Sequence, residues 1–255
     1  IRQTAYLIRN LSLTLVDDRE EEPYKETYCY AGGIAEYVSY INGGKDKVFD
    51  KVLYFEGKAD GIFVEAAFQP TRGSIFTIKS FCNNICTAGG GTHEEGFRLA
   101  LGRELNKYFQ AKGWIKGTEE NFLYEDLSEG LTAVISVKHP DPQYEGQVKD
   151  KLGSAEVRKI VSSIVGDKLS TWLMENPKEG RLFFERALSA FKGRKAAERA
   201  RKNIQSKGSL GGSMPDKLAD CISKKPEERE IFIVEGNSAG GSAKNGRDSY
   251  TQAIL

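Results

Sequence analysis

A single carboxylate stands where a short apolar run gives way to glycine-rich chain. Residues 231–234 are all apolar, as is typical of a buried parallel strand, and Glu235 and Gly236 follow directly. Ligands of open α/β sheets bind beyond the carboxyl ends of strands, and one carboxylate there suits Mg²⁺, whose remaining positions are filled by water and phosphate. The alternative is a turn that starts a helix, in which Glu235 only favours the helix dipole. The residues alone do not decide between these interpretations.

An amide and an ammonium group lie two positions apart in a proline-stiffened loop. Residues 131–137 alternate as a core strand does, and Pro140 and Pro142 then predict an extended loop that holds Gln147 and Lys149. In an extended chain residues two apart point to the same side, so both groups could meet a terminal phosphate, Lys149 as a point charge and Gln147 as an oriented donor. The alternative is a solvated loop, which the residues alone favour.

Positive charge gathers in one stretch, although the whole chain of 255 residues has a formal net charge of only +1. Residues 192–207 hold seven basic side chains against Glu198 alone. Such a stretch could contact phosphates without reading bases, which gives salt-sensitive, sequence-independent binding. The alternative is a solvated charged face. The basic residues are Lys192, Arg194, Lys195, Arg199, Arg201, Lys202 and Lys207.

The elements that must carry these groups follow from the spacing of apolar residues. Alternation predicts strands over residues 11–15, 24–30, 62–68, 75–81 and 131–137, the first of them half-buried. Helical spacing predicts helices over residues 34–41, 97–113 and 157–172, and another from Pro177 onward. Glycine and serine at 208–213 predict a linker and a domain boundary.

The cysteines and histidines predict no metal centre. Cys29, Cys82, Cys86 and Cys221 match no zinc or disulfide spacing, so they are expected to be free, buried thiols in a reducing cytoplasm. No apolar run approaches the ~20 residues of a membrane span. His93 could suggest a metal or catalytic site, but Thr92 and Glu95 around it have the spacing of a capping box that opens a helix.

Residues 235–244, with Arg247, Asp248 and residues 252–255, resemble the opening motif of the toprim domain in B subunits of bacterial type IIA DNA topoisomerases. The resemblance implies that Glu235 is a catalytic residue and a Mg²⁺ ligand in DNA cleavage and rejoining. Asn237 departs from the aspartate of the family, which removes a negative charge beside that metal site.

Residues 129–149 are similar to the transducer domain of the same family. The resemblance implies that Gln147 and Lys149 contact the γ-phosphate of ATP bound in a preceding ATPase domain; Val148 replaces a threonine between them. Residues 83–85, 90–98, 151–158 and 217–221 match the family in the same order, and residues 69–74, expected to form a surface hairpin, depart most from it.

The resemblance implies an α+β chain in three parts. Residues 1–20 would end a GHKL-type ATPase domain, residues 21–207 would form a transducer domain like domain 2 of ribosomal protein S5, and residues 208–255 would be a linker and the start of an α/β toprim domain. The DNA contacts would be Arg194, Lys195, Arg199, Arg201 and Lys202 on a helix that lines a DNA cavity, together with Lys244 in the toprim-like motif.

The implied function is that of an ATP-dependent type IIA topoisomerase B subunit of the gyrase kind, which couples ATP hydrolysis to DNA cleavage, passage and religation with negative supercoiling. The implied cofactors are ATP and Mg²⁺. The partners would be an A subunit in an A2B2 heterotetramer, a second B subunit on ATP binding, and double-stranded DNA, with no membrane. The location would be the cytoplasm or an organellar nucleoid.

Two other functions stay open: a topoisomerase IV B subunit that decatenates DNA, and a non-catalytic DNA-binding clamp in which Asn237 marks a decayed metal site. Both ends of the sequence look cut, and no Walker-type phosphate loop is present. We therefore expect a fragment that neither hydrolyses ATP nor cleaves DNA alone.

Overall fold

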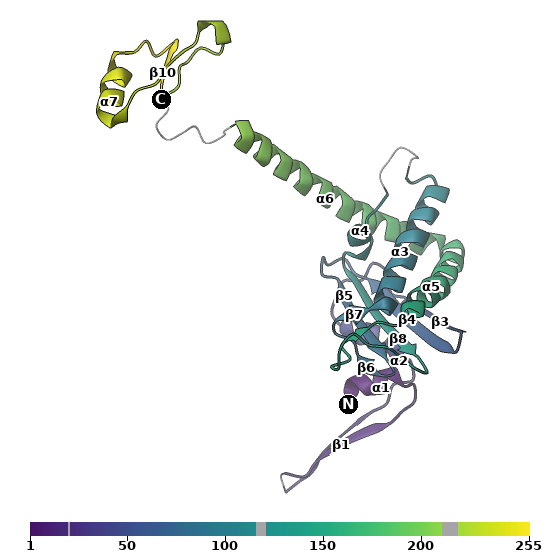
Figure 1. Cartoon of the computed structure of the whole chain (residues 1–255). Helices are drawn as coiled ribbons and strands as arrows, with labels where there is room; N and C mark the ends of the chain where they lie inside the picture. Colours follow the sequence, from purple (N-terminus) through teal and green to yellow (C-terminus); the bar gives the residue numbers. More distant parts are fainter. Residues whose placement is uncertain (20, 116–120, 211–218) are drawn as a thin grey trace. The chain divides into compact units, whose positions relative to one another are not determined.

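The computed structural model (Figure 1) describes residues 1–19, 21–115, 121–210 and 219–255, with the backbone alone for 204–210 and 237–239. These residues divide into two compact units, 1–195 and 196–255. No helix in the described part of the chain combines the length and apolarity needed to cross a membrane.

A mixed five-stranded sheet is the centre of the first unit. Its strand order is β3-β4-β8-β5-β6. β4 pairs antiparallel with β3 and β8, whereas β5 runs parallel to β8. The strands are β3 (Leu53–Ala59), β4 (Ile62–Pro70), β5 (Thr77–Cys82), β6 (Ile85–Cys86) and β8 (Leu131–Lys138).

Two helical layers cover the sheet. α3 (Thr92–Ala111) and α5 (Ala155–Glu175) pack against each other over one face, and α1 (Arg2–Leu7) and α2 (Gly33–Ile41) cover the other (Figure 1). The predicted helices at 34–41 and 157–172 are therefore confirmed.

Strand β8 lies in the centre of the sheet because both of its faces carry apolar side chains. Leu131, Ala133, Ile135 and Val137 face the α3/α5 core, and Val134 faces the core beneath α2. All five are fully buried, which is the two-sided burial of a central strand. The alternation read from the sequence is confirmed here.

Two sequence expectations about surfaces are only partly right. β1 (Leu13–Asp17) and β2 (Tyr24–Tyr28) form an antiparallel pair, but Leu15 and Val16 are exposed because no described layer covers them. Of the supposed surface hairpin at 69–74, residues 69 and 70 end β4, whereas residues 72–74 are exposed as predicted. Gln69 and Thr71 are buried there, because β4 lies beside β8 rather than β5 and the Thr71 amide donates to the Gly130 carbonyl.

Two smaller expectations also need correction. α6 (Pro177–Leu210) follows α5 as predicted but continues through residues 208–210, where a linker was expected. Of the four cysteines, Cys82 and Cys221 are buried, whereas Cys29 and Cys86 are exposed.

A short helix, α4 (Tyr124–Ser128), precedes β8.

The second unit contains one β-α-β element. β10 (Glu230–Phe232) pairs in parallel with β11 (Gln252–Ile254), and α7 (Gly236–Gly246) connects them. The short 3-10 helix η1 (Pro226–Glu228) precedes β10, and Ala219 pairs antiparallel with Ile254. The strand was expected to be buried, but Ile231 and Phe232 are 59% and 45% exposed.

Candidate functional site

The loop that holds Gln147 and Lys149 is a narrow hairpin with a defined base. Tyr144 pairs antiparallel with Leu152, and the Glu145 amide donates to the Lys151 carbonyl at 2.9 Å. An ion pair of 2.9 Å joins the side chains of the same two residues, Lys151 Nζ and Glu145 Oε2. These contacts hold Gln147 and Lys149 at the tip.

The tip is a turn and not an extended chain. Lys149 has a φ of 57°, in the left-handed region, and Gly146 has a φ of 86°. Gln147, Val148 and Lys149 are all exposed. The argument that Gln147 and Lys149 share a side because they lie two apart in a strand therefore does not apply. Lys149 Nζ lies 5.9 Å from the centre of the Tyr144 ring, and the Tyr144 hydroxyl donates to the Cys82 carbonyl at the end of β5.

Two glycines anchor the base of this hairpin to the start of α3. β7 (Gly90–Gly91) pairs in parallel with β9 (Lys151–Leu152), and the Gly89 amide donates to the Asp150 carbonyl at 2.8 Å. Gly91 has a φ of 133°, and a Cβ there would lie 2.3 Å from the Leu152 carbonyl oxygen. Only glycine fits this close approach. The signal in the sequence was the glycine run itself, which entered only through the family resemblance.

Buried polar side chains lie behind that base. His93 Nε2 is 2.9 Å from Thr87 Oγ1, which is 2.7 Å from Ser80 Oγ, and the Ser80 hydroxyl donates to Glu94 Oε1 at 2.7 Å. Burial lowers the pKa of His93 to about 4, against a weaker raising effect of the Gly91 backbone, so the imidazole is neutral near pH 7.

The capping box predicted around His93 is not formed. Gly91 is the N-cap of α3, and Thr92 is its first helical residue, with a buried hydroxyl that has no partner. Glu95 forms an ion pair of 2.8 Å with Arg158 on α5. The prediction is wrong because β9 approaches the start of α3 so closely that only a glycine, Gly91, fits at the N-cap.

Glu235 lies where the sequence places it, between β10 and α7. It is the N-cap of α7 and is exposed. The described residues contain no group of three or more His, Cys, Asp or Glu side chains that could hold a metal ion. Glu235 therefore offers one carboxylate, and the side chain of Asn237 lies outside the described residues.

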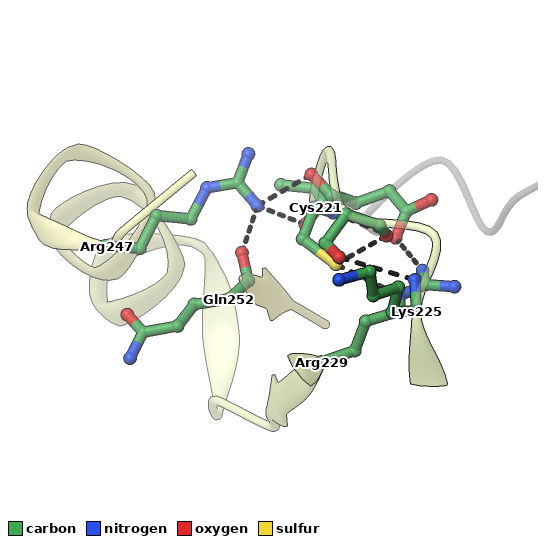
Figure 2. A network of polar contacts seen from close by, with 8 residues as sticks. Cys221, Lys225, Arg229, Arg247 and Gln252 are labelled. Atoms are coloured by element: carbon green, nitrogen blue, oxygen red, sulfur yellow. Dashed lines mark hydrogen bonds and ion pairs between the residues drawn. The ribbon is translucent and has the colours of Figure 1, made fainter. Parts of the chain in front are cut away.

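Two arginines link residues 219–221 to neighbouring segments of the second unit (Figure 2). Arg247 Nη1 donates to the carbonyls of Ala219, Asp220 and Gln252 at 2.5, 2.9 and 2.8 Å. Arg229 donates to Asp220 Oδ1 at 2.6 Å and to Cys221 Sγ at 3.1 Å. The part of the 217–221 motif that the structure describes, residues 219–221, thus serves as an anchoring segment for β11.

The basic residues predicted to contact DNA fall into two groups. Arg199, Arg201, Lys202 and Lys244 are exposed, and Lys202 forms an exposed ion pair of 2.8 Å with Glu198. Arg194 instead binds the Asp126 carboxylate, and Lys195 Nζ lies 5.7 Å from the centre of the Phe191 ring. The side chain of Lys207 lies outside the described residues.

Comparison with solved structures gives the class of protein. The 43K ATPase domain of Thermus thermophilus gyrase B, solved with an aminocoumarin, is similar with a TM-score of 0.71 and 35% identity, over 79% of this chain and 54% of that chain. The ATP-binding domain of Francisella tularensis topoisomerase IV shares the fold at a TM-score of 0.63 and 24% identity, over 76% of this chain and 51% of that one. The α+β arrangement is thus that of type II topoisomerase B-subunit structures.

Sequence comparison then gives the family. The DNA gyrase B family profile matches residues 33–203. The gyrase B protein of Streptococcus pneumoniae serotype 4 is 49% identical over the whole of this chain. The chain belongs to the DNA gyrase B family, and it spans 40% of the length of that relative.

Proposed function

We propose that this chain is the coupling segment of an ATP-dependent type IIA topoisomerase B subunit of the gyrase kind. Residues 1–20 would end its ATPase domain, residues 21–207 would form an S5-like transducer, and residues 208–255 would begin a toprim domain. The observation that carries the proposal is the hairpin tip, where Gln147 and Lys149 are exposed while its base is fixed to β7 and α3.

ATP bound in a preceding ATPase domain would meet this tip. The Lys149 ammonium would bind the γ-phosphate as a point charge, and the Gln147 amide would donate a directed hydrogen bond. Because the base of the hairpin contacts β7 and Tyr144 contacts the end of β5, a displacement of the tip would be transmitted to the sheet.

Glu235 would hold Mg²⁺ near the DNA. Its exposed carboxylate, at the N-cap of α7 beyond the end of β10, fits an ion that takes one or two protein carboxylates and keeps several waters. When bound, Mg²⁺ would supply positive charge beside the reacting phosphate. Glu235 itself would position the ion for DNA cleavage and religation, which the subunit would carry out with an A subunit in an A2B2 assembly.

Exposed cations would hold double-stranded DNA during this cycle. Arg199, Arg201, Lys202 and Lys244 can each contact phosphate without reading sequence. Arg194 and Lys195 are left out of the proposed set, because the Arg194 guanidinium already binds Asp126 and the Lys195 ammonium lies over the Phe191 ring. A second copy of the B subunit would pair with this one when ATP binds.

The sharpest test replaces Lys149 by Ala in the complete B subunit, assembled with its A partner. ATP turnover should fall by about 100-fold or more, as when one charged group that binds a reacting phosphate is lost, while ATP-independent relaxation is retained. Val148→Ala is the matched control, because Val148 lies between the two phosphate contacts and is 83% exposed. Unchanged turnover in Lys149→Ala would overturn the assignment.

The clamp alternative is separated by Glu235→Ala in the same assembly. A catalytic subunit should lose Mg²⁺-dependent cleavage, and Glu230→Ala on the preceding strand β10 should keep it. A clamp would show no such cleavage in either variant.

The topoisomerase IV alternative is separated by comparing the supercoiling activity of the assembly with its decatenation activity. The family profile and the identity to gyrase B favour a subunit of the gyrase kind.

A further inference from the structure

The buried chain His93–Thr87–Ser80–Glu94 has no role in the function proposed above. Ser80 belongs to β5, Thr87 to the segment after β6, and His93 and Glu94 to the first turn of α3. All four residues are at most 9% exposed. Three contacts of 2.9, 2.7 and 2.7 Å join them in one line.

The number of available protons decides which atom donates in each hydrogen bond of this line. The three contacts of this line need three protons, and the Glu94 carboxylate, which forms an ion pair with Arg98, can only accept. Ser80 Oγ also lies 3.0 Å from the Thr87 carbonyl oxygen, which can share the Ser80 proton but supplies none. The Ser80 proton therefore goes to Glu94, the Thr87 proton to Ser80, and the third proton must come from His93 Nε2. The opposite order would place a proton on the Glu94 carboxyl group, whose other oxygen instead forms an ion pair of 3.6 Å with Arg98.

One buried atom supports this direction. His93 Nδ1 has no hydrogen-bond partner of acceptable geometry. The Gly91 backbone lies near the ring but makes no hydrogen bond of acceptable geometry to Nδ1, so a proton there would be a poorly satisfied buried donor, which is rarer and costlier than an acceptor without a partner. The neutral tautomer with its proton on Nε2 follows.

The end of the chain meets the base of the hairpin. A Cβ on Gly90 would lie 2.9 Å from Glu94 Oε2, so the missing side chain leaves the room that the carboxylate occupies. Gly90 and its neighbour Gly91 form β7, which pairs with Lys151 and Leu152 directly after the Gln147–Lys149 tip. The polar chain and the hairpin thus share one two-residue strand.

We propose that the directed chain from His93 Nε2–H through Thr87 and Ser80 to Glu94 positions the β7–β9 pair, and with it the phosphate-binding tip. Thr87, Ser80 and His93 are positioning residues that touch no ligand. The structural part stands on the contacts of this chain alone, and its effect on ATP turnover rests on the proposed function.

The first test is the tautomer of His93. A ¹⁵N-labelled sample of the chain, which holds only His93 and His139 as histidines, should show the proton of His93 on Nε2 at pH 7. Thr87→Val should shift that signal and Thr87→Ser should restore it. A proton on Nδ1 of His93 would overturn the direction.

The second test is local hydrogen exchange at the base of the hairpin. Thr87→Val keeps the side-chain volume but removes the hydroxyl, so exchange of the Gly89 and Glu145 amides should accelerate about 5- to 10-fold, as for the loss of one buried hydrogen bond. Exchange in the β4–β8 ladder should stay unchanged, and Thr87→Ser should keep the protection of the parent. Equal protection in Thr87→Val and the parent would overturn the positioning role.

The third test uses the complete subunit with its A partner. Thr87→Val should lower the kcat of ATP turnover about 5- to 10-fold with little change in KM, and Thr87→Ser should rescue it. If Lys149→Ala abolishes turnover but Thr87→Val does not change it, the positioning inference is overturned and the proposed function stands. If Lys149→Ala has no effect, the proposed function is overturned, and the tautomer and exchange results alone decide the structural inference.

Discussion

The guanidinium of Arg194 on α6 forms two parallel hydrogen bonds with the carboxylate of Asp126 on α4, at 2.8 and 2.9 Å. The side chain of Asp126 is 2% exposed and that of Arg194 is 27% exposed. Asp126 Oδ2 also accepts from the Leu123 amide at the start of α4. A residue that looks like part of a basic DNA-binding stretch is therefore a structural partner of a buried acid.

Replacing Asp126 by Asn should destabilise the chain by about 2–3 kcal/mol. Breaking a buried pair typically costs about 3–5 kcal/mol, and the partial exposure of Arg194 reduces this. Urea unfolding of the chain measures the difference. Glu185→Gln is the matched control, because Glu185 pairs with Arg181 at an exposed i,i+4 position and should change the free energy of unfolding by less than about 0.5 kcal/mol. A similar loss in both variants would show that burial is not what gives the Arg194 pair its strength.

Acid should weaken the fold through His93. Burial lowers the pKa of His93 from its ordinary 6.5 to about 4 in the folded chain, so between these values the unfolded chain binds the extra proton. The stabilisation is complete above about pH 6.5 and is lost as the pH falls towards 4. Between about pH 7 and pH 5 it should cost about 2 kcal/mol, seen as a steeper decline of unfolding free energy in the parent than in His93→Gln. Parallel declines in the two chains would contradict this.

Two substitutions at Lys149, whose backbone is left-handed, can separate the effect of loop conformation from that of the ammonium charge. Lys149→Gly should be more stable than Lys149→Ala by about 1 kcal/mol, because alanine keeps the strain of the positive φ and glycine does not. Both variants lack the ammonium group, so both should lose ATP turnover equally in the complete subunit. Retained turnover in Lys149→Gly alone would mean that loop conformation, and not charge, matters there.

Charge reversal on α6 should weaken DNA binding without affecting sequence preference. Arg199→Glu combined with Arg201→Glu should lower the salt-dependence slope of duplex binding by about 2, since each lost phosphate contact removes about 0.9. Lys159→Glu with Lys168→Glu, two exposed positions on α5, matches the change in charge and should leave the slope unaltered. Equal effects in both pairs would point to net charge rather than to this surface.

Much of the fold follows from periodicity, because a side chain that must be buried leaves a regular pattern. The two faces of β8 and the buried stripe of α5 were predicted correctly. Apolar patterns mislead at β1, where Leu15 and Val16 are exposed, and at β10, where the continuous apolar run predicted a buried strand but Ile231 and Phe232 are exposed. Periodicity reports which side chains can be buried, and it does not report whether a second layer covers them.

The candidate site was less predictable, because its geometry depends on contacts between distant residues. The position of Arg194 in a basic run gives no hint of Asp126, which precedes it by 68 residues. The turn at the tip depends on pairing between Glu145 and Lys151, which forces Lys149 into a conformation rare for lysine. Thr92 fails as a helix cap because Gly91 must approach Leu152.

The exposed stretch of β10 governs how this chain can be handled. Ile231, Phe232 and Ile233, which directly follows β10, are 59%, 45% and 79% exposed, and in the described part of the chain the sheet pairs β10 with β11. Contiguous apolar strand residues of this kind promote self-association, which grows with protein concentration and with sulfate or phosphate in the buffer. Dilute samples, chloride salts and a light-scattering check before each unfolding or exchange measurement would therefore keep aggregation from being mistaken for a change in folding.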